Sequence, residues 1–303
     1  MLKRVLTAVA LLAVVFGFLL GLRQIHVVFA SGLIGLISVV ATYEMCQAFK
    51  KSEYNPMKIL LLATAVIAAC ATHFFGYAGL LLSVMFAVLV ALIIFTLVHK
   101  YELKDMIATA FIIVYPIAPL SLLIHLNNFD VVPSQVGAAY NSTGNLGLYA
   151  ILLTIILPIL VDSMAYFFGV LLGKYFPKKL CPDISPKKTI IGAIGGVVGG
   201  MLGAILIWLA FDKFHIFESF NNVAYFALTD ETWKSIIIYC VLGLVAAPLL
   251  ELGDLVASWI KRKAGIKDYG KLFPGHGGMM DRMDSIIYMI PITCLFLEIA
   301  VRI

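Results

Sequence analysis

Residues 59–98 read ILLLATAVIAACATHFFGYAGLLLSVMFAVLVALIIFTLV, forty positions without an Asp, Glu, Lys or Arg. A helix that crosses a bilayer needs about 20 predominantly apolar residues, so the stretch is long enough for two spans. We predict that these spans cover 57–75 and 77–98 and form a helical hairpin with a very short turn. The stretch therefore indicates an integral membrane protein.

The rest of the chain has the same character. Of its 303 residues, 62% are hydrophobic and 13% are charged, and the mean hydropathy is +1.02, whereas soluble domains carry about 25% charged residues. Apolar segments follow one another from end to end without a long polar linker. We predict one continuous, all-α, polytopic membrane domain, with five transmembrane helices in residues 1–145 and four in residues 146–303, where the informative polar stretches lie.

Nine apolar segments are candidate transmembrane helices: residues 5–22, 26–43, 57–75, 77–98, 106–126, 146–170, 190–211, 235–260 and 284–302. The first follows Lys3 and Arg4, as the apolar segment of a cleaved signal peptide also follows basic residues. Its apolar run is longer than that of a usual signal peptide, and we expect a retained helix.

The basic residues give the expected orientation, because cytoplasmic loops of membrane proteins are enriched in Lys and Arg. With the N-terminus in the cytoplasm and nine spans, only Arg23, Lys213, Lys234 and Arg302 fall outside. The other 18 of the 22 Lys and Arg residues fall inside. The sequence has no long basic run interleaved with aromatic residues, so we do not expect the protein to bind nucleic acid.

The most informative polar stretch is residues 258–284, predicted to lie on the cytoplasmic side. Its polar residues and glycines are Ser258, Lys261, Arg262, Lys267, Asp268, His276, Gly277, Gly278, Asp281, Arg282 and Asp284. Lys and Arg pair with phosphate oxygens, glycines let backbone N–H groups approach an anion, and carboxylates bind Mg²⁺ together with substrate phosphates. Two aspartates at a helix start are also typical helix caps. The density of polar residues favours a site for polyphosphate and metal.

Further upstream, three spans or their ends carry polar residues. Asp162 lies inside the sixth span, where an acidic residue is by default a candidate functional group. Glu251, Asp254 and Ser258 share one helical face, and for Glu251 we expect a side chain that snorkels to the interface. The loop Ser185-Pro186-Lys187-Lys188-Thr189 leads into a glycine-rich helix start, which suits a phosphate because helix N-termini attract anions.

The run from Ser258 to Asp284 resembles the signature of CDP-diacylglycerol synthases, also called phosphatidate cytidylyltransferases. That pattern has Ser, Lys-Arg, Lys-Asp, Pro-x-His-Gly-Gly and Asp-Arg-x-Asp, all at the spacing found here. The elements at Asp162, Asp254 and 185–189 are also similar to that family, and the resemblance covers residues 150–290. The chain departs from the family pattern at Val170 and Ile191, where many members carry Arg and Glu.

The resemblance implies that CTP and phosphatidate react to CDP-diacylglycerol and pyrophosphate, in phospholipid biosynthesis at a membrane such as the bacterial inner membrane. It implies Mg²⁺ held by Asp254 and Asp281, alone or with a second cation, and suggests a homodimer. The catalytic residues expected from it are Asp254, Asp281, Lys261, Arg262, Asp284 and His276. The substrate-binding residues expected from it are Ser185, Lys187, Lys188, Ser258, Lys267, Arg282 and Asp162.

Two other functions stay open on the sequence. A membrane transporter of an anionic solute would also have many spans, an acid inside the membrane and basic inner loops. A CTP-dependent lipid-alcohol kinase would share the handling of the nucleotide. Against the transporter, the acidic and glycine-rich residues concentrate at one cytoplasmic face.

Overall fold

The computed structural model describes residue 17 and residues 21–131, 144–214, 231–273 and 277–302. These residues form two compact units. Unit 1 combines the chain up to Asn128 with Ile260–Ile287, and unit 2 combines Phe129–Trp259 with Tyr288–Ile303. Two helices, α9 (Thr232–Lys263) and α10 (Met280–Arg302), contribute residues to both units. The division at residue 145 expected from the sequence stays a prediction.

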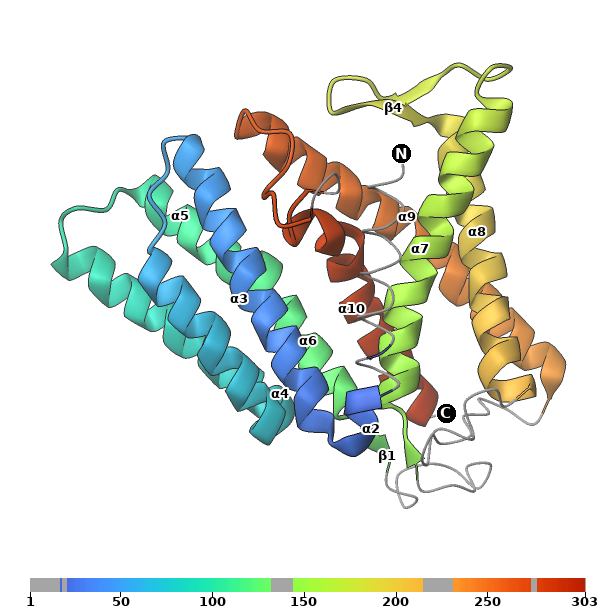
Figure 1. Cartoon of the computed structure of the whole chain (residues 1–303), viewed down its shortest axis with the longest axis horizontal. Coiled ribbons are helices and arrows are strands. Elements are labelled where there is room, and N and C mark those ends of the chain that lie inside the picture. The colour runs from blue at the N-terminus through green and yellow to red at the C-terminus, as the bar shows by residue number, and fades with distance from the viewer. Residues whose placement is uncertain (1–16, 18–20, 132–143, 215–230, 274–276, 303) are drawn as a thin grey trace. The chain divides into compact units, whose positions relative to one another are not determined.

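The N-terminal part of unit 1 is a bundle of apolar helices (Figure 1). It contains α2 (Arg23–Ile25), α3 (Val27–Lys51), α4 (Lys58–Leu97), α5 (Leu103–Ile112), a π-helical turn (Ile113–Ile117) and α6 (Ala118–Asn127). The π-helical turn, which contains Pro116, connects α5 and α6 into one continuous apolar segment. At one end of the bundle the Arg23 Nε donates to Asn127 Oδ1 at 2.8 Å, and at the other the Asn55 N–H donates to Asp105.

The helix α4 is a hairpin of two helices that turns at Gly76. This residue has φ +57° and ψ −135°, a conformation open to glycine and rarely adopted by other residues. After the turn, Gly79 packs directly on the backbone of Ala71, so the two halves touch near the turn without a loop. At about 1.5 Å per residue each half is roughly 30 Å long, which matches a bilayer core. The predicted hairpin is confirmed.

Unit 2 contains α7 (Gly147–Leu172), α8 (Ile190–Trp208), a π-helical turn (Leu209–Lys213) and most of α9. Two short antiparallel ribbons complete it: β1 (Asp130–Val131) pairs with β2 (Gly144–Asn145), and β3 (Lys179–Cys181) pairs with β4 (Ser185–Thr189). Figure 1 shows the second ribbon between α7 and α8 in the chain. Inside the unit, the Tyr149 and Tyr239 hydroxyls lie 2.7 Å apart.

Glycines on two sides of α8 set the spacing of the helices in unit 2. Toward α7, a Cβ on Gly203 would lie 2.9 Å from the Leu160 side chain. Toward α9, a Cβ on Gly200 would lie 2.7 Å from the Gly243 carbonyl oxygen and 2.8 Å from the Ala247 Cβ. Small residues let helix backbones approach closely in membrane proteins, so the glycines of α8 have a packing function.

Six helical segments among the described residues are long and apolar enough to cross a membrane. They are Val27–Lys51, Lys58–Leu97, Leu103–Asn127, Gly147–Leu172, Ile190–Phe211 and Thr232–Lys263. The second of them holds two predicted spans, and α10 corresponds to the ninth. The first predicted span, 5–22, lies almost wholly outside the described residues. The all-α polytopic fold is confirmed, and the count of nine stays a prediction.

We expect Gly200→Val to destabilise the protein by about 1–3 kcal/mol, because side-chain atoms there overpack the contact between α8 and α9. A lower midpoint of thermal unfolding in detergent would show this loss. Leu202→Ala is the control on the same helix, since the Leu202 side chain is exposed. Equal midpoints for Gly200→Val and the wild type would contradict the close approach.

Candidate active site

The carboxylate of Asp281 organises the loop between α9 and α10 in unit 1. Its Oδ1 lies 2.8 Å from Lys261 Nζ, and its Oδ2 accepts the backbone N–H groups of Tyr269 at 2.8 Å and Gly278 at 2.9 Å. The Asp281 side chain is 5% exposed and that of Lys261 is 13% exposed. A buried carboxylate is stable only with such partners, and here it closes a loop of the sequence signature onto the start of α10.

Tyr269 lies next to the ion pair of Lys261 and Asp281. Lys261 Nζ lies 5.4 Å from the ring centroid, within the range of a cation–π contact. Burial, together with the nearby carboxylates of Asp281 and Asp284, raises the pKa of the Tyr269 hydroxyl above its usual range. The phenol therefore stays neutral at any physiological pH and adds no negative charge beside Asp281.

Gly277 allows the loop to fold back on Asp281. It has φ +85°, and a Cβ at this position would lie 2.8 Å from Asp281 Oδ2. Its carbonyl oxygen accepts the Phe273 N–H at 2.9 Å. The neighbouring Gly278 N–H thus approaches an anion that belongs to the chain itself, whereas the approach of such groups to a substrate phosphate stays a prediction.

Glu44 is a residue of this loop environment that the sequence reasoning missed. It lies on α3, is 6% exposed, and accepts the N–H groups of Met279 at 3.0 Å and Met280 at 2.8 Å. The available signal is an acidic side chain at the end of an apolar span, a signal that Glu251 and Asp254 share. More than 200 residues of sequence separate Glu44 from the signature, and no spacing rule connects the two.

The other predicted residues of the signature have different environments. Arg262, Lys267 and Arg282 are exposed, whereas Asp284 is only partly exposed and its Oδ1 accepts the Ser285 N–H at 2.9 Å. These three basic residues lie near Lys261 and Asp281 in the sequence. Their exposed positive charge suits contact with a soluble polyanion. His276 lies outside the described residues.

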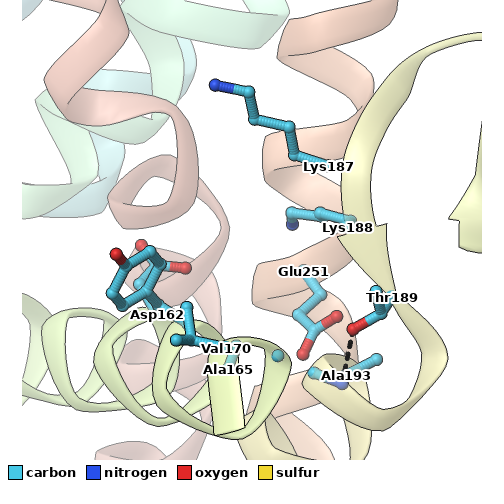
Figure 2. Close-up of a pocket in the computed structure, with 11 residues that line it drawn as sticks. Asp162, Ala165, Val170, Lys187, Lys188, Thr189, Ala193 and Glu251 are labelled. Atoms are coloured by element: carbon cyan, nitrogen blue, oxygen red, sulfur yellow. Dashed lines mark hydrogen bonds between the residues drawn. The ribbon is translucent and has the colours of Figure 1, made fainter. Parts of the chain in front are cut away.

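Unit 2 contains a pocket of about 390 Å³ with charged residues in its wall (Figure 2). Its lining residues come from α7, the strand β4, α8 and α9: Asp162, Ala165, Tyr166, Gly169, Val170, Lys187, Lys188, Thr189, Gly192, Ala193 and Glu251. Three predicted substrate-binding residues, Asp162, Lys187 and Lys188, therefore line one pocket. Val170, where the chain departs from the family pattern, lines the same pocket.

The strand β4 and the start of α8 bring the basic residues into this pocket. The Thr189 hydroxyl caps α8 by accepting the Gly192 N–H at 3.1 Å. Lys188 Nζ lies 2.8 Å from Asp254 Oδ2, with both side chains partly exposed. Lys187 extends away from Glu251 and Thr189 in Figure 2. Ser185, at the beginning of β4, and Ser258, on α9, are partly exposed and do not line the pocket.

The snorkelling orientation expected for Glu251 is wrong. The residue is 6% exposed, and its Oε1 has no hydrogen-bond partner among the described residues. A Cβ on Gly196 of α8 would collide with this oxygen, so only a glycine leaves room for the carboxylate there. Tight packing between α8 and α9 holds the side chain inside unit 2.

The two aspartates predicted to bind Mg²⁺ each pair with a lysine, Asp281 with Lys261 and Asp254 with Lys188. No group of three or more His, Cys, Asp and Glu side chains that could hold a metal occurs within the described ranges. Mg²⁺ often uses only one or two carboxylates and takes its other ligands from phosphates and water. The residues present therefore fit a cation that binds together with a nucleotide.

Comparison with known proteins gives a consistent result. The sequence model of the cytidylyltransferase family matches residues 2–300. A Staphylococcus saprophyticus protein named phosphatidate cytidylyltransferase is 33% identical over 212 residues, which are 66% of this chain and 71% of the relative. Proteins of the same name from Staphylococcus haemolyticus and Staphylococcus aureus are 33% and 32% identical, with the same shares of the two chains covered.

We expect Gly277→Ala to destabilise the loop more than Gly265→Ala does. Both residues have positive φ, +85° and +63°, so an alanine is strained at either position, by about 1–3 kcal/mol. Only at Gly277 does the new Cβ also displace the carboxylate of Asp281, because nothing lies within 4 Å of a Cβ at Gly265. Hydrogen exchange at the Tyr269 amide measures the difference. Equal exchange in the two variants would contradict it.

Proposed function

Because this chain belongs to the cytidylyltransferase family, we propose that it is a phosphatidate cytidylyltransferase, which converts CTP and phosphatidate to CDP-diacylglycerol and pyrophosphate. The observation that carries the proposal is the buried pair of Lys261 and Asp281, which closes the glycine loop of the signature. Neither the transporter nor the lipid-alcohol kinase is favoured by the similarities.

In the proposed reaction an oxygen of the phosphatidate phosphate attacks the α-phosphorus of CTP. A bond forms between them while the bond from the α-phosphorus to the bridging oxygen breaks, and pyrophosphate leaves with that electron pair. A phosphate monoester is largely ionised near neutral pH, so the chain need not supply a strong base. Catalysis of such a step depends on positioning and on neutralising charge.

The residues of this chain supply positive charge in two places. In unit 1 these are Lys261 with the exposed Arg262 and Arg282, and in unit 2 they are Lys187 and Lys188 at the pocket. We assign both groups to phosphate binding. The apolar helices that carry them support a substrate whose acyl chains stay in the bilayer while its phosphate meets CTP at the interface.

For the cofactor we propose Mg²⁺, alone or with a second cation, bound by Asp254 and Asp281. When bound, the cation would neutralise negative charge on the phosphates of CTP. Lys188 and Lys261 hold the two carboxylates in the structure. With a cation bound to these carboxylates, Lys188 and Lys261 would pair with phosphate oxygens of the substrates instead.

The distribution of Lys and Arg supports a cytoplasmic N-terminus and a cytoplasmic site, on the side where CTP is made. In unit 1, Arg23 lies with Asn127 at one end of the bundle, whereas the segment between Lys51 and Lys58 contacts Asp105 at the other end. This separation agrees with the alternation of sides expected from the sequence. For assembly we propose a homodimer, on the family resemblance alone.

The purified protein in detergent, supplied with phosphatidate, labelled CTP and Mg²⁺, is expected to form a labelled liponucleotide and pyrophosphate. Chelation of Mg²⁺ should abolish the product, and its re-addition should restore it. Thin-layer chromatography of the lipid phase measures the reaction. Absence of product in the folded protein, together with uptake of an anionic solute into vesicles, would favour the transporter instead.

We expect Asp254→Asn and Asp281→Asn each to lower turnover by at least about 100-fold, because each removes a charge worth several kcal/mol in the transition state. Asp183→Asn is the matched control, since Asp183 is exposed in the turn between β3 and β4. Initial rates across a Mg²⁺ titration make the measurement. Wild-type turnover in either variant would remove that aspartate from the catalytic machinery.

A further inference from the structure

We propose that Glu44 is a positioning residue of this enzyme: it fixes the start of α10 by binding backbone N–H groups that would otherwise be open to an external anion. The proposal rests on the proposed function and adds a residue from the N-terminal half, outside the signature. It also gives α3 a place in the reaction.

The hydrogen bonds of Glu44 are the first observation. Both carboxylate oxygens are used, Oε1 by the Met279 N–H at 3.0 Å and Oε2 by the Met280 N–H at 2.8 Å. The first N–H groups of a helix have no partner within it and carry partial positive charge. A carboxylate that bridges two of them is therefore bound as an external anion would be.

The shape around Glu44 is the second, independent observation. A Cβ on Gly270 would lie 2.6 Å from the Glu44 Cδ, and a Cβ on Gly278 would lie at the same distance of 2.6 Å. Neither glycine needs a left-handed conformation, because only Gly76, Gly265 and Gly277 have positive φ among the described glycines. Their lack of a side chain is instead explained by the carboxylate that fits between them.

Together, Glu44 and Asp281 accept three consecutive N–H groups at the turn into α10. Asp281 accepts from Gly278, and Glu44 accepts from the next two residues. In this arrangement the glycine loop does not bind nucleotide phosphates through these amides. Its amides hold the loop in shape, and phosphate binding is left to side chains such as Arg282, two residues into α10.

The consequence for catalysis is geometric. Met280 begins α10 and Asp281 follows it, so a shift of the helix start moves the carboxylate that faces Lys261. Misplacing a catalytic group by about 1 Å can cost about 100-fold in rate. Glu44 acts through Asp281 and touches no reacting atom, so its loss should reduce kcat far more than it raises the KM for CTP.

The test uses the full-length protein in detergent and compares Glu44→Gln with Glu53→Gln. The first substitution keeps the size of the side chain but presents one N–H₂ group to the backbone donors. We expect kcat to fall by about 10–100-fold, the loss typical when a residue that orients a functional side chain through a hydrogen bond is replaced. The KM for CTP should stay within about threefold of the wild type. Glu53→Gln, at an exposed position just after α3, should retain wild-type kcat. A wild-type kcat in Glu44→Gln would overturn the proposal.

A second variant separates positioning from simple loss of fold. Glu44→Ala leaves a space of carboxylate size between Gly270 and Gly278, and added formate should restore turnover in a saturable manner. Formate should have no effect on Glu44→Gln, whose side chain fills the space. Folded Glu44→Ala that formate does not restore at any concentration contradicts the proposal.

Hydrogen exchange gives a readout independent of the reaction. The Met279 and Met280 amides should exchange faster in Glu44→Gln than in the wild type, by a factor of about ten or more for a lost charge-assisted hydrogen bond, while amides in α7 stay unchanged. Unchanged exchange at both methionines would refute the anion-binding role of Glu44. If the wild type forms no liponucleotide although these amides behave as expected, the proposed function fails and the role of Glu44 at the helix start stands.

Discussion

The loop between α9 and α10 depends on buried carboxylates that bind its own backbone. Four N–H groups, those of Tyr269, Gly278, Met279 and Met280, donate to Asp281 or Glu44. A buried carboxylate without donors is costly, and so is a helix start without acceptors. Each requirement satisfies the other here, and Lys261 adds the charge that Asp281 needs. The glycines of the loop leave the space that these two carboxylates need to reach the backbone.

Unit 2 uses glycines in a different way. On α8 they let the backbones of α7 and α9 approach, so that Asp162, Lys188 and Glu251 line one pocket although they come from three different segments. The pocket contains charges of both signs, and Lys188 is already paired with Asp254. In both units a lysine therefore neutralises an aspartate of the proposed catalytic set. Such pairing lowers the free-energy cost of placing acidic groups among apolar helices.

Much of this could be predicted from the sequence, because the governing patterns are local. The apolar run 59–98 predicts a hairpin through its length, and the spacing of Lys261, Gly277 and Asp281 predicts a common site. Glu44 was missed because its partners are backbone groups, which leave no trace in side-chain spacing. Glu251 was misjudged because snorkelling assumes an open path to the interface, whereas Gly196 and α8 enclose its carboxylate.

The hairpin of α4 also bears on how the chain enters a membrane. Its two halves are joined at Gly76 by a turn without charged residues, and near that turn Gly79 packs on the backbone of Ala71. Insertion of this hairpin therefore requires no polar loop to cross the bilayer. During synthesis the two halves are thus expected to partition into lipid as one preformed pair, so that the unit of insertion is the hairpin and not the single helix.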